Sequence, residues 1–231
     1  SPYFLYQQQS PAFISGRFGI EQPDWYRLKG LNLQVSERFK ALRRWIRSAP
    51  VPLSLQDAAR HYDIEDLNNW VLAITFTSTT DNNQGSYFID AADPAARWRS
   101  LTWDMDCAFN DLTHKTESGW IDYSRDPFTA LDGYRAELFL RLFHESTEYR
   151  MQFMAHARRK LANELHRDKL TAIADRYIKL SSTLTSPDSA TTRIMHDTKE
   201  FLLSRHPIFL SYLERKEKEA TTRALAGEGA M

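Results

Sequence analysis

Two short acidic segments frame a predicted β-hairpin near the middle of this chain: Thr80-Asp81-Asn82-Asn83-Gln84-Gly85-Ser86 and Trp103-Asp104-Met105-Asp106-Cys107-Ala108-Phe109. An apolar stretch that ends at Phe76 leads into the first segment, and its acidic start at Asp63 suits the beginning of a helix. Residues 87–89 and 98–103 favour strands, with the turn signal Asp93-Pro94 between them. The predicted order of elements along the chain is therefore a helix, an acidic loop, a hairpin and an acidic strand end.

Helical patterns dominate on both sides of this region. Apolar residues recur at helical spacing from Val35 to Ile46, and Ser54 is a suitable N-cap for a short helix that follows. After an irregular stretch at residues 106–132, the pattern predicts helices at about 134–145, 147–166, 168–184 and 187–217. Residues 10–30 contain several glycines and prolines, so we expect this stretch to be rich in loops.

The expected fold class is mostly α (α+β), a small β-hairpin with the acidic site embedded in helices. Residues 10–217 are expected to form a single domain. Alternating aromatic and polar residues predict a short strand within residues 1–9, and the small residues near the C-terminus suggest that residues 218–231 are a frayed tail. Because Ser1 is not a methionine and a strand already follows it, we expect the chain to be a piece of a longer protein.

The composition limits the class of protein. Apolar residues make up 42% of the 231 residues, which indicates a globular protein with a sizeable core. Lys+Arg and Asp+Glu are both 30, so the formal net charge of zero argues against a nucleic-acid partner. No apolar run approaches the ~20 residues of a membrane span, and no signal-peptide pattern is present. The single cysteine, Cys107, excludes an intrachain disulfide, and a small buried residue is its favoured role.

Asp81 follows a predicted buried helix and lies in a polar loop before a strand. A carboxylate in such a loop can orient and deprotonate an attacking hydroxyl, since phosphoryl transfer depends on positioning and electrostatics. The alternative is an aspartate that caps its own turn, which is common in Thr-Asp-Asn sequences. The residues alone leave both interpretations open.

Asp104 and Asp106 lie two residues apart, so they share a face if the strand continues that far. Paired carboxylates repel each other unless a cation neutralises them, and Mg²⁺ prefers oxygen ligands. The alternative is an acidic strand end that faces solvent or pairs with arginine.

Other catalytic signatures are missing from the sequence. The seven histidines show no zinc spacing, and neither a G-x-S-x-G elbow nor a Gly-rich phosphate loop is present. The densest basic run, Arg158 to Lys160, is best explained as a solvated helix face.

From about residue 25 onward the chain resembles the CotH kinase-like family, named for a spore-coat protein kinase. The resemblance rests on the helix that runs into Thr80-Asp81, on Tyr87–Asp90 and Arg97–Asp106, and on the helical stretches 145–153 and 201–213. It implies the helical C-terminal lobe of an atypical kinase that transfers the γ-phosphoryl group of ATP to serine or threonine of a protein substrate.

The same resemblance assigns roles to the acidic residues. Asp81 would be the catalytic base, Asp106 the ligand of Mg²⁺ (or Mn²⁺), and Asp104 an assistant to the metal or the loop. Kinase catalytic loops place a metal-binding asparagine five residues after the base, where this chain has Ser86. Asn82 or Asn83 could take over that role, so Asn83 and Ser86 join the candidate metal ligands.

The resemblance also implies partners outside this sequence. Residues 1–9 would include a hinge strand, and the N-terminal lobe of the parent polypeptide would supply the phosphate-binding lysine, because Lys29 and Lys40 fall in a predicted loop and a predicted helix. A cell-surface, secreted or spore-coat location is implied in the same way. Two other functions stay open: a catalytically inactive relative that serves in adhesion or assembly, and a metal-dependent phosphodiesterase built on Asp104 and Asp106.

Overall fold

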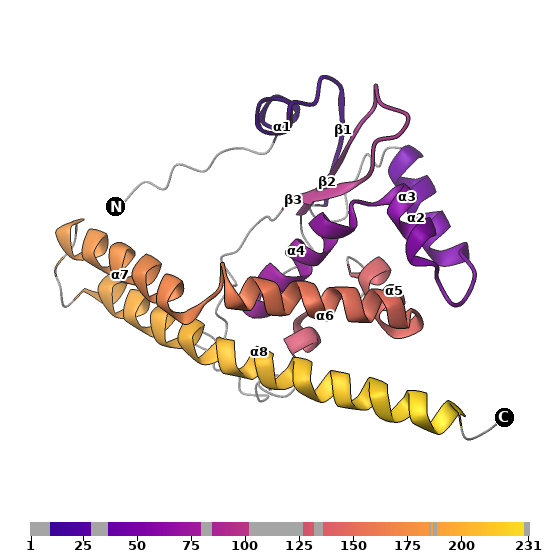
Figure 1. Cartoon of the computed structure of the whole chain (residues 1–231). Helices are drawn as coiled ribbons and strands as arrows, with labels where there is room; N and C mark the ends of the chain where they lie inside the picture. The colour runs from indigo at the N-terminus through magenta and orange to yellow at the C-terminus, as the bar shows by residue number, and fades with distance from the viewer. Residues whose placement is uncertain are drawn as a thin grey trace, which may run out of the picture. The chain divides into compact units, whose positions relative to one another are not determined.

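The computed structural model describes residues 10–28, 37–79, 85–101, 127–131, 136–184, 186 and 189–228 (Figure 1). These residues form eight α-helices and one small three-stranded sheet, which confirms the predicted mostly α fold class. The chain divides into two compact units, and the division falls within one helix. The first unit comprises Ser1–Val71, Asp81–Met105 and Asp132–Ser146, and the second comprises Leu72–Thr80, Asp106–Leu131 and Thr147–Met231. The expectation of a single domain stays a prediction.

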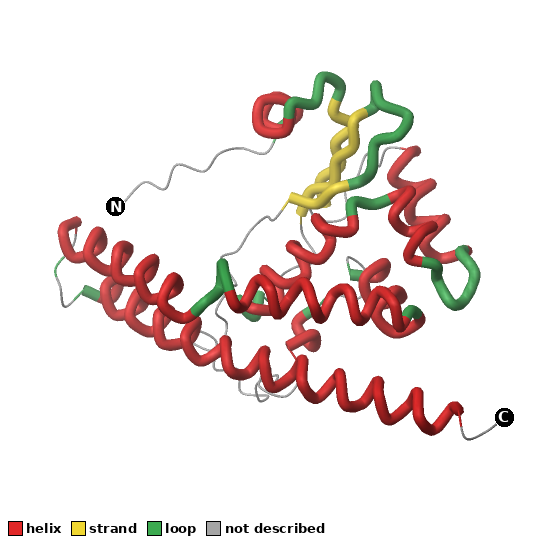
Figure 2. The backbone as a smooth tube through the Cα atoms, viewed as in Figure 1, coloured by secondary structure: helices red, strands yellow, loops and turns green. Residues whose placement is uncertain are grey.

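The sheet of the first unit contains the predicted hairpin and one further strand. Strand β2 (Gly85–Asp90) pairs with β3 (Arg99–Leu101) in antiparallel register, which confirms the hairpin. Strand β1 (Pro23–Leu28) pairs with the other edge of β2, so the strand order is β1-β2-β3. Figure 2 shows the strands in yellow. The edge strands of the sheet are therefore β1 and β3, and β2 lies between them.

The sequence suggested a loop-rich stretch at residues 10–30, but the described part of it, residues 10–28, consists mainly of a helix and a strand. Helix α1 (Pro11–Phe18) begins there, capped by Ser10, whose hydroxyl accepts a hydrogen bond from the Phe13 N–H at 3.2 Å. Proline suits the first turn of a helix, and Gly19 ends the helix at φ 68°, a conformation that glycine adopts without strain. The prolines and glycines thus mark the ends of helices and strands. Strand β1 forms because it pairs with β2, which lies about 60 residues later in the sequence.

Helices α2 (Glu37–Ser48), α3 (Leu55–His61) and α5 (Glu137–Glu145) complete the first unit, together with the first part of α4 (Ile64–Phe76). All four helices were predicted, as was the Ser54 cap, which accepts the Asp57 N–H at 3.3 Å. The ring of Phe39 on α2 lies 4.8 Å from that of Tyr87 on β2, measured between centroids. Helix α2 therefore buries its apolar face against the sheet.

The second unit contains the end of α4 and the helices α6 (Thr147–Ala162), α7 (Arg167–Leu184) and α8 (Ala190–Glu228), with a short 3₁₀ turn, η3 (Pro127–Ala130). Helices α7 and α8 lie side by side (Figure 1). The predicted end of the last helix at residue 217 is wrong, because α8 continues to Glu228. His156 is buried in α6. None of the helices described here is long and apolar enough to cross a membrane.

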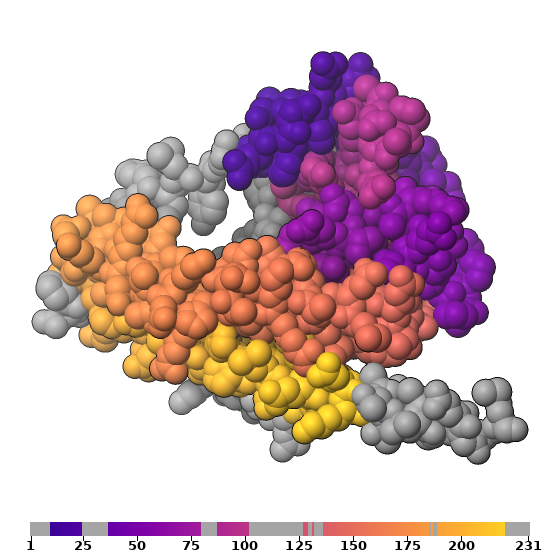
Figure 3. All heavy atoms as spheres, viewed as in Figure 1, coloured from indigo at the N-terminus to yellow at the C-terminus, as the bar shows by residue number. Residues whose placement is uncertain are grey.

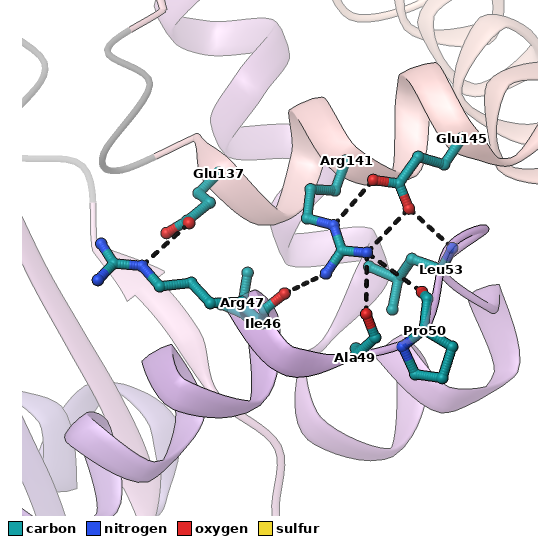
Figure 4. A network of polar contacts seen from close by, with 8 residues as sticks. All are labelled: Ile46, Arg47, Ala49, Pro50, Leu53, Glu137, Arg141 and Glu145. Carbon is teal, nitrogen blue, oxygen red and sulfur yellow. Dashed lines mark hydrogen bonds and ion pairs between the residues drawn. The ribbon is translucent and has the colours of Figure 1, made fainter.

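A partly buried ion pair on α5, Arg141 with Glu145, links this helix to the C-terminal end of α2 within the first unit (Figure 4). Arg141 donates to both carboxylate oxygens of Glu145 at 2.9 Å and also to the main-chain carbonyls of Ile46, Ala49 and Pro50. The last carbonyls of a helix have no partner within it, so this guanidinium supplies the donors that α2 lacks. Glu145 in turn accepts the Leu53 N–H at 2.9 Å. The pair thus fixes the chain as it leaves α2.

We predict that Arg141→Met lowers the free energy of unfolding by about 2–4 kcal/mol at neutral pH, because Glu145 and several carbonyls lose their donor. The hydrogen bonds from Arg141 are the main reason why the pKa of Glu145 lies below its ordinary value. That contribution is therefore complete above the ordinary glutamate pKa of about 4.3 and is lost as the pH falls below it. Urea unfolding at several pH values should show the difference between wild type and variant shrinking in acid.

Arg60→Met is the matched control, since Arg60 forms an ion pair with Asp57 whose side chains are 67% and 48% exposed. Its effect should stay below about 1 kcal/mol. If Arg141→Met lowers the free energy of unfolding as little as this, or by an amount that does not change with pH, the proposed role of the Arg141–Glu145 pair is contradicted.

Candidate functional site

The predicted site residues fall mainly outside the described part of the chain. Asp81, Asn83, Asp104 and Asp106 are not among the described residues, and of Ser86 only the backbone is described, as part of β2. Their predicted roles therefore stay predictions. The structure does describe the elements from which both acidic segments emerge, and these elements define the candidate site.

The strand residues next to the two acidic segments lie at the same end of the sheet. The chain enters β2 at Gly85 and leaves β3 at Leu101, and in the antiparallel register Leu101 lies opposite Ser86. Strand β1 also ends here, because Leu28 lies opposite Gly85. In such a ladder, facing residues have Cα atoms about 5 Å apart. The chain leaves β3 at Leu101, two residues before Trp103. It enters β2 at Gly85, at the same end of the sheet.

Carboxylates at the start of α4 hold β3 in place within the first unit. Asp63 caps α4 by accepting the Asp66 N–H at 3.1 Å, and its other oxygen pairs with the Arg99 guanidinium at 3.1 Å. Asp66 accepts the Ser100 N–H at 2.7 Å, and the Tyr62 hydroxyl is hydrogen-bonded to the Ser100 hydroxyl. Negative charge is favourable at a helix N-terminus, so these contacts stabilise α4 as well as the strand. They fix the strand from which Asp104 and Asp106 follow.

The C-terminal end of α4 closes in a tight turn within the second unit. Thr79 donates its N–H to the Ile74 carbonyl at 3.0 Å, and Ser78 donates to the Thr75 carbonyl at 3.4 Å. This pair of bonds is a Schellman motif, which requires a left-handed residue that is usually glycine. Ser78 occupies that position with φ 50°. The turn ends at Thr79, two residues before Asp81 in the sequence.

A buried arginine of α8 completes this helix end. Arg205, which is only 1% exposed, donates to the carbonyls of Thr75 at 2.9 Å and Phe76 at 3.2 Å. Its guanidinium carbon lies 5.7 Å from the ring centroid of Phe201 and 5.6 Å from that of Phe209. A cation at a helix C-terminus complements the macrodipole, and aromatic faces favour a cation that has left water. Arg205 is therefore a cap supplied by a helix about 130 residues away along the chain.

Sequence reasoning missed the role of Arg205. A signal was present, because Arg205 lies four residues after Phe201 and four before Phe209, which places it on the apolar stripe of a helix. A charged residue in such a stripe indicates a buried partner. The pattern could not identify that partner, because main-chain carbonyls leave no trace in a sequence.

The described residues contain no group of three or more His, Cys, Asp or Glu side chains that could hold a metal ion. A groove of about 420 Å³ in the first unit is lined by three aspartates. Asp63 is paired with Arg99, while Asp90 and Asp93 accept N–H groups of their own turns. These carboxylates therefore have structural roles.

Comparison with known proteins identifies the family. The family model described as CotH kinase protein matches residues 34–202, which is more than half of the chain and includes both acidic segments. No curated protein and no solved structure matches the chain. The chain therefore belongs to the CotH kinase family.

Proposed function

We propose that this chain is the helical lobe of a CotH-type kinase, which transfers the γ-phosphoryl group of ATP to serine or threonine of a protein substrate. The observation that carries the proposal is the sheet register, in which Ser86 lies opposite Leu101. This register supports a shared site for the two acidic segments, because the first leads into the hairpin and the second leaves it at the same end. The family match over residues 34–202 supports the type of reaction.

In the proposed reaction, Asp81 accepts the proton of the substrate hydroxyl. The hydroxyl oxygen then bonds to the γ-phosphorus as the bond from that phosphorus to the bridging oxygen breaks, and ADP leaves. A carboxylate is an adequate base because the transition state is loose and little charge develops on the attacking oxygen. The cap on α4 supports this role, since positioning dominates phosphoryl transfer.

Asp106 and Asp104, with Asn83 or Ser86, supply oxygen donors of the kind that Mg²⁺ or Mn²⁺ prefers. A bound divalent cation would offset the negative charge of the phosphates. These residues would hold it near the base, because β3, which precedes Asp104, ends at the end of the sheet where β2 begins after Asp81.

We predict that Asp81→Asn and Asp106→Asn each lower phosphate transfer by about a hundredfold or more, because the amide is a poor base and a weaker metal ligand. Incorporation of labelled phosphate by the natural polypeptide that contains this chain is the measurement. Asp175→Asn is the control, since this carboxylate pairs with Lys199 on the surface of the second unit. Undiminished transfer by Asp106→Asn would contradict the proposal.

Mg²⁺ and ATP together should raise the melting temperature of the same polypeptide by about 4 °C or more at saturating concentrations. ATP with a chelator should give a smaller shift, and Asp106→Asn should abolish the dependence on the metal. Absence of any shift in the wild type would favour the inactive adhesion or assembly protein. Hydrolysis of a phosphodiester without ATP would favour the metal-dependent phosphodiesterase.

Arg205→Met should loosen the turn that leads into Asp81, because the Phe76 carbonyl loses its arginine donor and the Thr75 carbonyl keeps only the Ser78 N–H. We expect faster amide exchange at Ser78 and Thr79 and a free energy of unfolding lower by about 2–4 kcal/mol. Arg215→Met, on the exposed side of the same helix, is the matched control. Unchanged exchange at these two amides would contradict the capping role.

A further inference from the structure

Helix α7 carries a row of large apolar side chains that the described structure leaves exposed. Ile173, Tyr177, Leu180 and Leu184 are 53%, 58%, 51% and 72% exposed. They follow Leu170 at alternating spacings of three and four residues, which is the a/d pattern of a coiled-coil seam. We call Ile173, Tyr177, Leu180 and Leu184 the α7 stripe. Figure 3 shows α7, in orange, at the surface of the molecule.

Packing against α8 does not use this row. The α7 side chains that are buried are Leu170 and Ser181, and the Ser181 hydroxyl lies 3.5 Å from that of Thr192 on α8. On a helical wheel Ser181 lies on one flank of the α7 stripe. Helix α8 therefore covers that flank and leaves the seam itself open to a further partner.

The other flank of the α7 stripe is basic. Lys169 and Arg176 are exposed and lie one heptad apart, each one residue before an a position. Such flanking positions form the charge pairs that select a coiled-coil partner. Asp175 lies elsewhere on the wheel and is paired with Lys199 at 2.5 Å. The seam is thus apolar in its centre and positively charged along its free edge.

This charge pattern disfavours a second copy of the same helix. In an antiparallel pair the equivalent flanks face each other, so Lys169 and Arg176 would meet their own counterparts. In a parallel pair the basic flank would meet the flank that α8 already covers. A membrane surface is also a poor match, because two apolar positions per heptad form a narrow seam rather than the wide face of an interfacial helix.

We propose that the α7 stripe docks an amphipathic helix of a partner protein, with apolar residues in its own seam and acidic residues along the flank that meets Lys169 and Arg176. The apolar seam supplies the affinity, and the charged flank selects the partner. This interaction is independent of the phosphoryl-transfer proposal, since it uses no residue of either acidic segment.

The test uses two labelled helical peptides of about three heptads, with leucine at the seam positions and either glutamate or lysine at the flanks. Fluorescence anisotropy with the 231-residue chain should show that the glutamate peptide binds about tenfold tighter than the lysine peptide. Arg176→Glu should remove or reverse this preference while leaving the fold unchanged, because the residue is exposed.

Replacing Leu180 and Leu184 by serine should weaken binding of the glutamate peptide about tenfold or more. Met151→Ser is the matched control, since Met151 is 65% exposed on α6, and its binding should equal that of wild type. Equal affinity for both peptides, or unchanged binding by the Leu180/Leu184 variant, would overturn the proposal.

Two other results would also overturn it. A wild-type dimer in sedimentation that the serine substitutions dissolve would assign the α7 stripe to a second copy of this chain. Binding to phosphatidylserine vesicles that the same substitutions abolish, without binding of either peptide, would assign it to a membrane surface.

Discussion

At two helix ends in the described part of this protein, an arginine from a distant helix donates hydrogen bonds to main-chain carbonyls. Arg141 serves α2, and Arg205 serves α4. A carbonyl buried without a donor would cost as much as a lost hydrogen bond or more, so each arginine also specifies which helix lies beside which end. The α4 end capped by Arg205 is the one that precedes Asp81 in the chain.

Helix α4 shows how this constraint serves the proposed function. Its first turn is tied to β3 through Asp63 and Asp66, and its last turn is closed by Ser78 and Arg205. The first turn of α4 thus contacts the strand that precedes Asp104, and its last turn precedes Asp81 in the chain. Loops that carry chemistry work best on rigid supports, and these polar contacts supply the rigidity.

Local patterns predicted much of this arrangement. The periodicity of α2 and α4, the Ser54 cap and the hairpin turn at Asp93-Pro94 all depend on interactions between residues a few positions apart. Helix α1 and strand β1 were missed because prolines and glycines mark element ends as well as loops. From the sequence, the candidate site could be predicted only as two acidic segments and their resemblance to a family. The register of β2 and β3, the strands next to these segments, depends on pairing that the sequence does not state.

The sequence by itself determined the family, the mostly helical fold class and the positions of nearly all helices, because helical spacing and capping are local properties. Only the tertiary structure decided that β1 joins the sheet, that Arg141 and Arg205 cap helices, and that the α7 stripe is exposed. Each of these depends on groups that meet across long stretches of chain, as Arg205 meets Thr75 at a separation of 130 residues. An apolar seam has the same pattern whether it is buried or open, so solvent exposure is decided only when the helices pack.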